Sequence, residues 1–195
     1  MARIKEFDVD EALEAAMRVF WSRGYEATSV ADLSLATRLS RSSLYGTFSD
    51  KHDLFLRCLG YYSETIGSVF FSQLRDADAG LNTIRNCFSV LLEAVTNAPR
   101  RSCLNVNSAA ELAHRDHEVR KHIRGYDRHV RSCFHAALQS AQRRGETTDG
   151  ADLEAHAAHL SISAQGLLLQ AKAHPPKKAV QSYVSLVLAS LPERE

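Results

Sequence analysis

The sequence predicts an all-α protein of nine helices. Glycine and proline together account for 13 of its 195 residues, and the first proline is Pro99. A β-sandwich or barrel needs a turn about every 8–12 residues, so a chain with so few turn-forming residues disfavours both architectures. Apolar residues instead recur at steps of three and four in nine successive segments, which is the spacing of amphipathic helices. A chain of this length forms one or two domains that share one core.

The first helix is expected between Asp8 and Gly24. From Val9 onward its apolar residues fall at i, i+4, i+7, i+8, i+11 and i+12, which places them on one face of a helix. Asp8 and Glu11 have the spacing of a capping box, and Gly24 is a typical C-terminal stop.

Two short helices follow, at 30–37 and 41–48. Thr28 or Ser29 can cap the first of them, and the Ser40 hydroxyl can reach a free amide at the start of the second. Only two residues connect the two helices. Such a pair, held against a preceding amphipathic helix, forms a helix-turn-helix, whose second helix enters the major groove of DNA.

The second short helix has one face suited to a protein core and one suited to DNA. Leu44 and Phe48, four residues apart, belong to the core face. The opposite face carries short hydroxyl side chains and a glycine, which allow a close approach to base edges. Free amides at the neighbouring helix N-termini favour a phosphate oxygen. The residues expected to contact DNA are Thr28, Ser29, Arg38, Arg41, Ser42, Ser43, Tyr45, Gly46, Thr47 and Lys51.

An alternative is that this polar helix is merely solvated. The whole chain has a net charge of +1, and residues 1–55 contain seven Lys and Arg against nine Asp and Glu. Four of those nine acids belong to the first helix or its cap, away from the face that would read DNA. DNA binding therefore has to depend on a local arrangement and not on the overall charge.

The remaining helices are longer. The fourth begins at Ser49 or Asp50 and runs toward Leu74. Five more are expected at 81–97, 104–114, 117–144, 153–173 and 178–191.

Residues 12–54 contain a dense series of characteristic positions: Phe20, Gly24-Tyr25, Thr28-Ser29-Val30, Ser40-Arg41-x-x-Leu44-Tyr45-x-x-Phe48 and Lys51-x-x-Leu54. With them this segment resembles the DNA-binding domain of TetR-type (TetR/AcrR) transcriptional regulators. One departure is the turn, where the family usually has a glycine and this chain has Thr37-Arg38-Leu39. The resemblance implies a small DNA-reading domain, here 6–66 with the helix-turn-helix at 29–48, and a larger ligand-binding and dimerisation domain at 67–195.

The resemblance also implies a function. We expect a homodimeric, cytoplasmic, ligand-responsive repressor that binds a palindromic operator in double-stranded DNA and releases it when a small molecule binds. The helix from Leu153 to Ala173 and the helix from Lys178 to Leu191 are expected to pair their apolar stripes with a second subunit; the alternative is that these stripes pack within their own subunit. The alternative function is that of a small-molecule carrier or an enzyme on the same fold without DNA binding.

Candidates for the effector pocket follow from helical faces and from the layout of the family. At each of these positions plain core packing is an equally good interpretation. The segment Cys103-Leu104-x-x-Asn107-x-x-x-Glu111 resembles one found in a subgroup of TetR-type regulators, some of which respond to electrophiles. The candidates are Tyr62, Ile66, Phe70, Phe88, Cys103, Asn107, Glu111, Tyr126, Val130 and Gln165.

Cys103 is also a candidate for a reactive thiol. Arg100 and Arg101 precede it, and a helix begins beside it, so both guanidinium groups and the helix N-terminus favour a thiolate. The preferred alternative is that Cys103 is a small core residue and that the effector binds without covalent chemistry.

No cofactor, metal site or catalytic site is predicted. The pairs His114-x-x-His117 and His156-x-x-His159 have no cysteine or carboxylate at a spacing that completes a four-ligand set, and no known catalytic motif appears. The N-terminus lacks the apolar core of a signal peptide, and no apolar stretch approaches the roughly 20 residues of a membrane span. The four cysteines are therefore expected in a reducing cytoplasm, and because they have no C-x-x-C spacing, neither a zinc site nor a disulfide framework is indicated.

Overall fold

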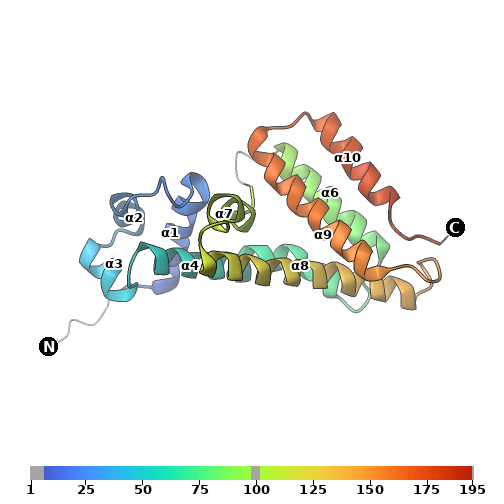
Figure 1. The fold of residues 1–195 in the computed structure, drawn as a ribbon, viewed down its shortest axis with the longest axis horizontal. Coiled ribbons are helices and arrows are strands. Elements are labelled where there is room, and N and C mark those ends of the chain that lie inside the picture. Colours follow the sequence, from blue (N-terminus) through green and yellow to red (C-terminus); the bar gives the residue numbers. More distant parts are fainter. Residues whose placement is uncertain (1–6, 98–101, 195) are drawn as a thin grey trace.

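The structure is a computed structural model that describes residues 7–97 and 102–194. Within these two ranges the regular structure is helical, apart from one isolated β-bridge between Thr147 and Glu193. The all-α prediction is confirmed, and each of the nine expected helices has a counterpart in the described part of the chain (Figure 1).

The part of the chain that is predicted to read DNA, the DNA-reading end, contains three helices and the start of a fourth. The first three are α1 (Val9–Arg23), α2 (Val30–Thr37) and α3 (Arg41–Thr47). The fourth is a continuous rod composed of α4 (Lys51–Tyr62), a π-helical segment (Ser63–Gly67), α5 (Ser68–Phe71) and a 3₁₀ segment (Ser72–Arg75). The larger part of the chain contains α6 (Leu81–Asn97), α7 (Leu104–Leu112), α8 (His117–Arg143), α9 (Leu153–Gln170), a 3₁₀ segment (Ala171–Ala173) and α10 (Lys177–Ala189).

The caps decide where the short helices begin. Ser29, and not Thr28, caps α2: its hydroxyl accepts from the Asp32 amide at 3.1 Å, and the Asp32 carboxylate accepts in return from the Ser29 amide at 2.9 Å. Asp50 caps α4 by accepting from the Asp53 amide at 2.8 Å. These side chains satisfy amides that a helix N-terminus leaves without a partner.

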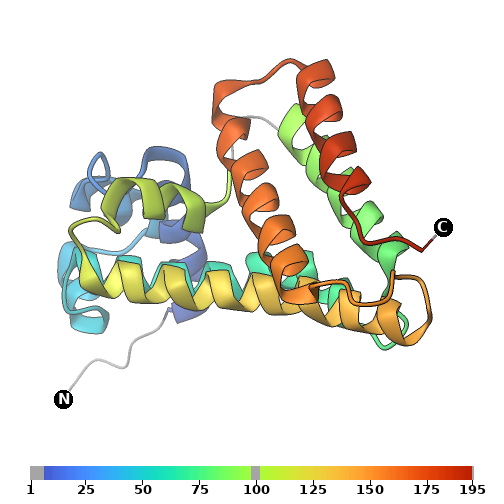
Figure 2. The same ribbon diagram turned by 45° about the vertical axis from the view of Figure 1, so that its right-hand side comes forward.

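The helices form two groups connected by long rods. α1, α2, α3 and the start of α4 lie together at one end, and α6, α9 and α10 pack at the other (Figure 1). α8 runs alongside the α4–α5 rod for much of the length of the molecule, and α7 lies between the two groups (Figure 2). The division predicted at residues 66 and 67 falls inside the π-helical segment of this rod.

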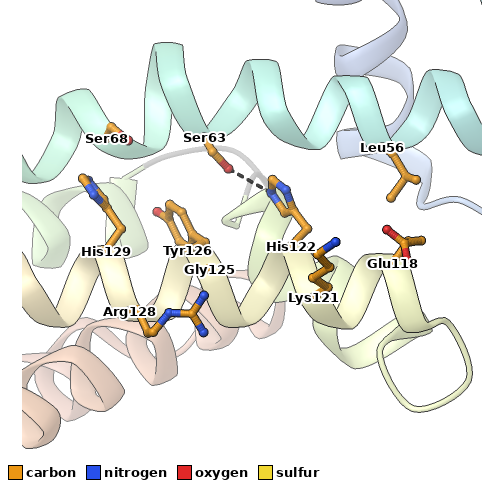
Figure 3. A pocket seen from close by; sticks show the side chains of 10 residues that line it. All are labelled: Leu56, Ser63, Ser68, Glu118, Lys121, His122, Gly125, Tyr126, Arg128 and His129. Carbon is orange, nitrogen blue, oxygen red and sulfur yellow. Dashed lines mark hydrogen bonds between the residues drawn. The ribbon is translucent and has the colours of Figure 1, made fainter.

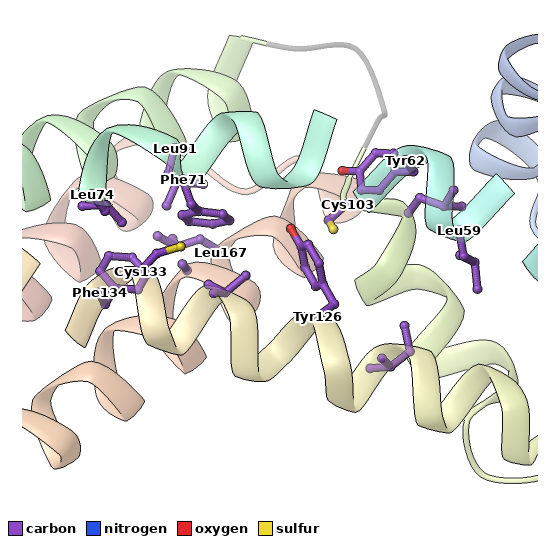
Figure 4. Packing of buried hydrophobic residues seen from close by; sticks show 14 of the residues in the cluster. Leu59, Tyr62, Phe71, Leu74, Leu91, Cys103, Tyr126, Cys133, Phe134 and Leu167 are labelled. Atoms are coloured by element: carbon purple, nitrogen blue, oxygen red, sulfur yellow. The ribbon is translucent and has the colours of Figure 1, made fainter. Parts of the chain in front are cut away.

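One hydrophobic core extends through both groups. Phe20 and Phe55, with ring centroids 5.0 Å apart, lie in its DNA-reading end. Phe71 and Phe134 lie in its other end (Figure 4), where the Phe88 ring centroid is 5.9 Å from that of Phe134. All five side chains are almost completely buried. Burying a phenylalanine contributes about 1.5–3 kcal/mol, so this continuous core stabilises the two groups as one body.

The apolar stripes expected to face a second subunit instead face their own. Leu160 and Leu167 of α9 and Val184 and Val187 of α10 are buried within the chain, as are most of the other residues predicted at that interface. The alternative, in which these stripes pack within their own subunit, therefore holds for most of their residues. Tyr183, a member of the predicted stripe on α10, stays exposed on the outer surface, together with three apolar residues outside the stripes: Ile162, Leu169 and Leu186.

The turn between α2 and α3 contains a left-handed residue. Arg38 has φ +56° and ψ +23°, and it lies in the turn where the family that this sequence resembles usually has a glycine. A side chain costs about 1–2 kcal/mol in this conformation. The turn therefore holds a side chain in a conformation that glycine would adopt without strain.

We expect Arg38→Gly to raise the free energy of unfolding by up to about 1 kcal/mol, because glycine relieves the strain but costs more chain entropy. Equilibrium urea unfolding measures the change. Arg38→Ala is the matched control, since it removes the same charge and keeps the strain, so its stability should stay near that of the wild type. Equal stability of the glycine and alanine variants would contradict this account.

Candidate functional site

α3 presents a polar face to solvent. Ser40 caps the helix by accepting from the Ser43 amide at 3.1 Å, and its hydroxyl lies 2.9 Å from the hydroxyls of both Ser42 and Ser43. Leu44 on the opposite face is buried. The core therefore holds α3 by one side and leaves its hydroxyl-bearing side open.

The residues predicted to contact DNA divide by exposure. Arg38, Arg41, Ser42 and Gly46 are exposed, and a Cβ added to Gly46 would meet no atom within 4 Å. Those that are partly buried keep polar atoms near the same surface: Ser43, Tyr45, Thr47 and Lys51. The Arg41 guanidinium lies 5.7 Å from the Tyr45 ring centroid, and the Lys51 ammonium lies 4.2 Å from the Tyr25 ring centroid. The aromatic faces thus hold two cations at this surface.

Thr28 has a different role from the DNA contact that the sequence predicts. Its side chain is only 1% exposed, and its hydroxyl donates to the Gly24 carbonyl at 2.6 Å. It stabilises the turn before α2 from inside and does not offer its hydroxyl to a phosphate. Ser29 has its side chain engaged in the capping box with Asp32, whose pKa is lowered by hydrogen bonds from Ser29 and by its ion pair with Arg23.

Glu111 also has a different role from the predicted one. It was predicted to line an effector pocket, but it reaches the loop between α1 and α2. One carboxylate oxygen accepts from the Tyr25 amide at 3.1 Å and the other from the Glu26 amide at 2.9 Å. Gly24 has φ +82°, and a Cβ there would lie 2.8 Å from this carboxylate. Only glycine therefore allows so close an approach.

Other polar contacts join the larger part of the chain to the DNA-reading end near this carboxylate. Arg115 forms an ion pair with Glu26, and the Trp21 indole N–H donates to the Ser102 carbonyl. On the far side of α7, His52 of α4 lies 2.6 Å from Asp116, which caps α8. Burial opposes ionisation of Asp116, but hydrogen bonds from Val119 and His52 outweigh it and lower the pKa of this carboxyl group.

Cys103 lies at the start of α7 with its sulfur between two phenols. It is 2% exposed, and the side chains of Tyr62 and Tyr126 lie beside it (Figure 4). Burial raises the pKa of the Cys103 thiol, although hydrogen bonds from Tyr62 and Tyr126 and from two backbone amides act against this. The burial of Cys103 fits the preferred alternative, in which this residue is a small part of the core. Arg100 and Arg101, on which the hypothesis of a reactive thiol depended, lie outside the described residues.

The other pocket candidates are scattered. Phe88 and Val130 are core residues, whereas Ile66 and Phe70 lie nearer the surface. Asn107 accepts from the Ser102 hydroxyl at 2.9 Å, and its buried amide nitrogen has no hydrogen-bond partner among the described residues. The Gln165 amide lies 3.3 Å from the Ser161 hydroxyl. The structure thus brings together Tyr62, Cys103 and Tyr126 but does not gather the whole set.

A groove between the α4–α5 rod and α8 was not predicted. Its volume is about 540 Å³, and Tyr126 is its one residue among the predicted candidates (Figure 3). The signal that could have found it is a polar row on α8, since His122 and His129 are seven residues apart with Gly125 between them. The groove is lined by Leu56, Ser63, Ser68, Glu118, Lys121, His122, Gly125, Tyr126, Arg128 and His129.

A partly buried hydrogen-bond network lies at the inner side of this groove. The Ser63 hydroxyl donates to the Leu59 carbonyl and accepts from the Asn105 amide at 2.9 Å. The His122 Nε2 atom lies 3.1 Å from the Ser63 hydroxyl and 3.2 Å from the Asn105 carbonyl oxygen. Burial lowers the pKa of His122. Because Asn105 belongs to α7, the network connects the groove to the helix that carries Glu111.

Comparison with known proteins decides the family. The family model described as bacterial regulatory proteins of the tetR family matches residues 12–58, and that described as the tetracyclin repressor-like C-terminal domain matches 80–187. The uncharacterized HTH-type transcriptional regulator YezE of Bacillus subtilis is 31% identical over 98% of this chain and 100% of its own. The chain belongs to the TetR family of bacterial transcriptional regulators.

Two further TetR-family relatives extend the comparison. The HTH-type transcriptional repressor ComR of Escherichia coli is 26% identical over 98% of this chain and 92% of its own. A cysteine mutant of the regulator CifR, solved with a 26-base-pair operator DNA, is 28% identical, with a TM-score of 0.85 over 97% of this chain and 100% of that one. Among the described residues, no helix is long and apolar enough to cross a membrane, and no cluster of three or more His, Cys, Asp or Glu is arranged to hold a metal ion.

We expect Glu111→Gln to lower the free energy of unfolding by about 1–3 kcal/mol, because it removes a charge-assisted acceptor from two backbone amides. Hydrogen exchange should accelerate at the Tyr25 and Glu26 amides in particular. Glu93→Gln is the control, since Glu93 is an exposed carboxylate on α6. Unchanged exchange at both amides in Glu111→Gln would show that this contact does not hold the loop.

Proposed function

We propose that this TetR-family chain is a homodimeric repressor that reads a palindromic operator with α3 and releases it when a small molecule binds the larger part of each subunit. The observation that carries the proposal is the open polar face of α3, with Arg41 and Ser42 exposed beside a helix N-terminus. It is supported by CifR, which is 28% identical and was solved on operator DNA, and by ComR, which is named a repressor.

Each proposed contact has a distinct role. Ser42, Ser43 and Thr47 are short enough for α3 to approach base edges, and Gly46 leaves room for that approach. Lys51, at the N-terminus of α4, is proposed to bind a phosphate together with free backbone amides. Phosphate contacts set the register of the helix in the groove, whereas base contacts determine the sequence that is bound.

The proposed dimer uses the outer surfaces of α9 and α10. Ile162 is 66% exposed and Leu186 is 72% exposed, and Leu169 and Tyr183 are also exposed on these two helices. Large exposed apolar side chains gathered on one surface mark an interaction site. A twofold dimer would place two copies of α3 in successive major grooves, which a palindromic operator requires.

The effector is proposed to bind without covalent chemistry. Cys103 is buried and its thiol pKa is raised, so little of the nucleophilic thiolate is present at neutral pH. Cys58 and Cys133 are also buried, and burial, together with the neighbouring Cys133, raises the pKa of the half-buried Cys87 to about 12. An electrophile would therefore find no activated thiol at the described surface.

We expect Lys51→Ala to weaken binding to all DNA sequences and to reduce the salt dependence of binding by about one phosphate contact. Gly46→Arg should alter base preference or abolish operator binding without unfolding, because a Cβ added there would meet no atom within 4 Å. Fluorescence anisotropy on operator and random DNA at several salt concentrations tests both. Arg143→Ala, at the far end of α8, is the control. Wild-type salt slopes and base preferences in both variants would rule out α3 as the reading helix.

We expect Ile162→Glu and Leu186→Glu to give folded monomers, because both side chains are exposed within the subunit but would bury a carboxylate in the dimer. Sedimentation equilibrium reports the mass, and circular dichroism checks the helix content. Val69→Glu, on α5, replaces an equally exposed apolar residue away from these helices and should remain dimeric. Dimers in both test variants would place the interface elsewhere.

A further inference from the structure

We propose that the groove between the α4–α5 rod and α8 binds a small ligand through a carboxylate or phosphate group, and that this ligand is the effector. The inference rests on the proposed function and adds to it a location and a chemical class. Its volume of about 540 Å³ is that of a site for a metabolite-sized molecule.

The charge of the groove favours an anion. Lys121 and Arg128 line it from α8, and neither forms an ion pair within the described residues (Figure 3). Glu118, the one acid that lines the groove, is exposed at one end and lies 3.0 Å from His117. α8 as a whole carries two acids, Glu118 and Asp127, against six basic residues: Arg120, Lys121, Arg124, Arg128, Arg131 and Arg143.

The interior of the groove suits the rest of such a ligand. Gly125 leaves space at its centre, and Leu56 and Tyr126 provide apolar surface. The Tyr126 ring lies against Gly67 of the π-helical segment, where a Cβ would be 2.8 Å from the ring. π-Helical segments are frequent at functional sites, and this one lets the rod and α8 approach without filling the groove.

The same groove has a direct connection to the DNA-reading end. His122 lines it and also bonds to Asn105, a buried residue of α7. The far end of α7 carries Glu111, which holds the Tyr25 and Glu26 amides just before α2. A ligand that draws the His122 ring toward its anionic group would change the Asn105 contact and shift α7. That shift would alter the orientation of α2 and α3.

Trp21 reports on this connection because it is the only tryptophan in the chain and its indole donates to the Ser102 carbonyl, one residue before Cys103 and the start of α7. Its ring also contacts Tyr62, with centroids 5.1 Å apart. A shift of α7 should therefore change the tryptophan emission, independently of any DNA.

The test uses benzoate and phenyl phosphate as anionic probes and benzamide as the neutral counterpart of benzoate. Isothermal titration calorimetry on the dimeric protein should give saturable binding of at least one anion, with a Kd in the millimolar range or tighter, and none of benzamide. The anion that binds more tightly identifies the carboxylate or phosphate class. Absence of saturable binding for both anions, or equal binding of benzamide, would overturn the proposal.

Variants locate the site. The double variant Lys121→Gln with Arg128→Gln should weaken anion binding by about tenfold or more, because two charge-assisted contacts are lost. Arg124→Gln, on the same helix but outside the groove, should keep the wild-type affinity within about twofold. An equal effect of Arg124→Gln would mean that the anion is held by the general charge of α8, which contradicts a defined site.

Coupling is measured separately. The bound anion should shift the Trp21 emission and lower operator affinity, and Glu111→Gln should reduce both responses while keeping anion affinity unchanged. Anion binding with no change in operator affinity would overturn the effector assignment of this groove. A protein that does not bind operator DNA at all would contradict the proposed function, and the calorimetric result for the groove would remain separately readable.

Discussion

One carboxylate that holds two backbone amides fixes α7 against the DNA-reading helices, which share a continuous core with the rest of the molecule. Glu111 of α7 accepts from the Tyr25 and Glu26 amides at 3.1 and 2.9 Å, and the positive φ of Gly24 leaves space for it. These amides lie just before α2, where the backbone turns and has no helical partner for them. The interaction therefore gives both loop amides a hydrogen-bond acceptor and fixes α7 against the DNA-reading helices at the same time.

Long helices connect this contact to distant parts of the molecule. α4 belongs to the DNA-reading end and continues through its π-helical segment into α5, while α8 runs beside it. Ser63, His122 and Asn105 connect this rod, α8 and α7 in one hydrogen-bond network. Packed helices shift as units because their side chains interdigitate, so a change at the groove is carried by whole helices. The TetR-family architecture thus places an open groove along the rods that connect the two groups and α3 at one end of a single packed body.

The two faces of α9 and α10 have different roles. Their regular apolar stripes complete the core of their own subunit, where Leu160, Leu167, Val184 and Val187 are buried. Their outer faces carry fewer apolar residues in less regular positions, among them Ile162 and Leu186. Both faces carry apolar residues because one supports folding and the other is available for association. The helical spacing of apolar residues in the sequence mainly reveals the face that has more of them.

The sequence by itself determined the local features: the helix bounds, the caps at Ser40 and Asp8, and the two short helices, because each depends on residues within a few positions of one another. It also predicted which side of α3 faces the core. Only the tertiary structure decided what covers each helical face. Glu111 bonds to an amide 86 residues away, Ser63 meets His122 across 59 residues, and Cys103 is buried beneath two tyrosines. Helical spacing assigns a residue to a face, but the neighbour that covers that face comes from the packing of distant segments, which no local pattern encodes.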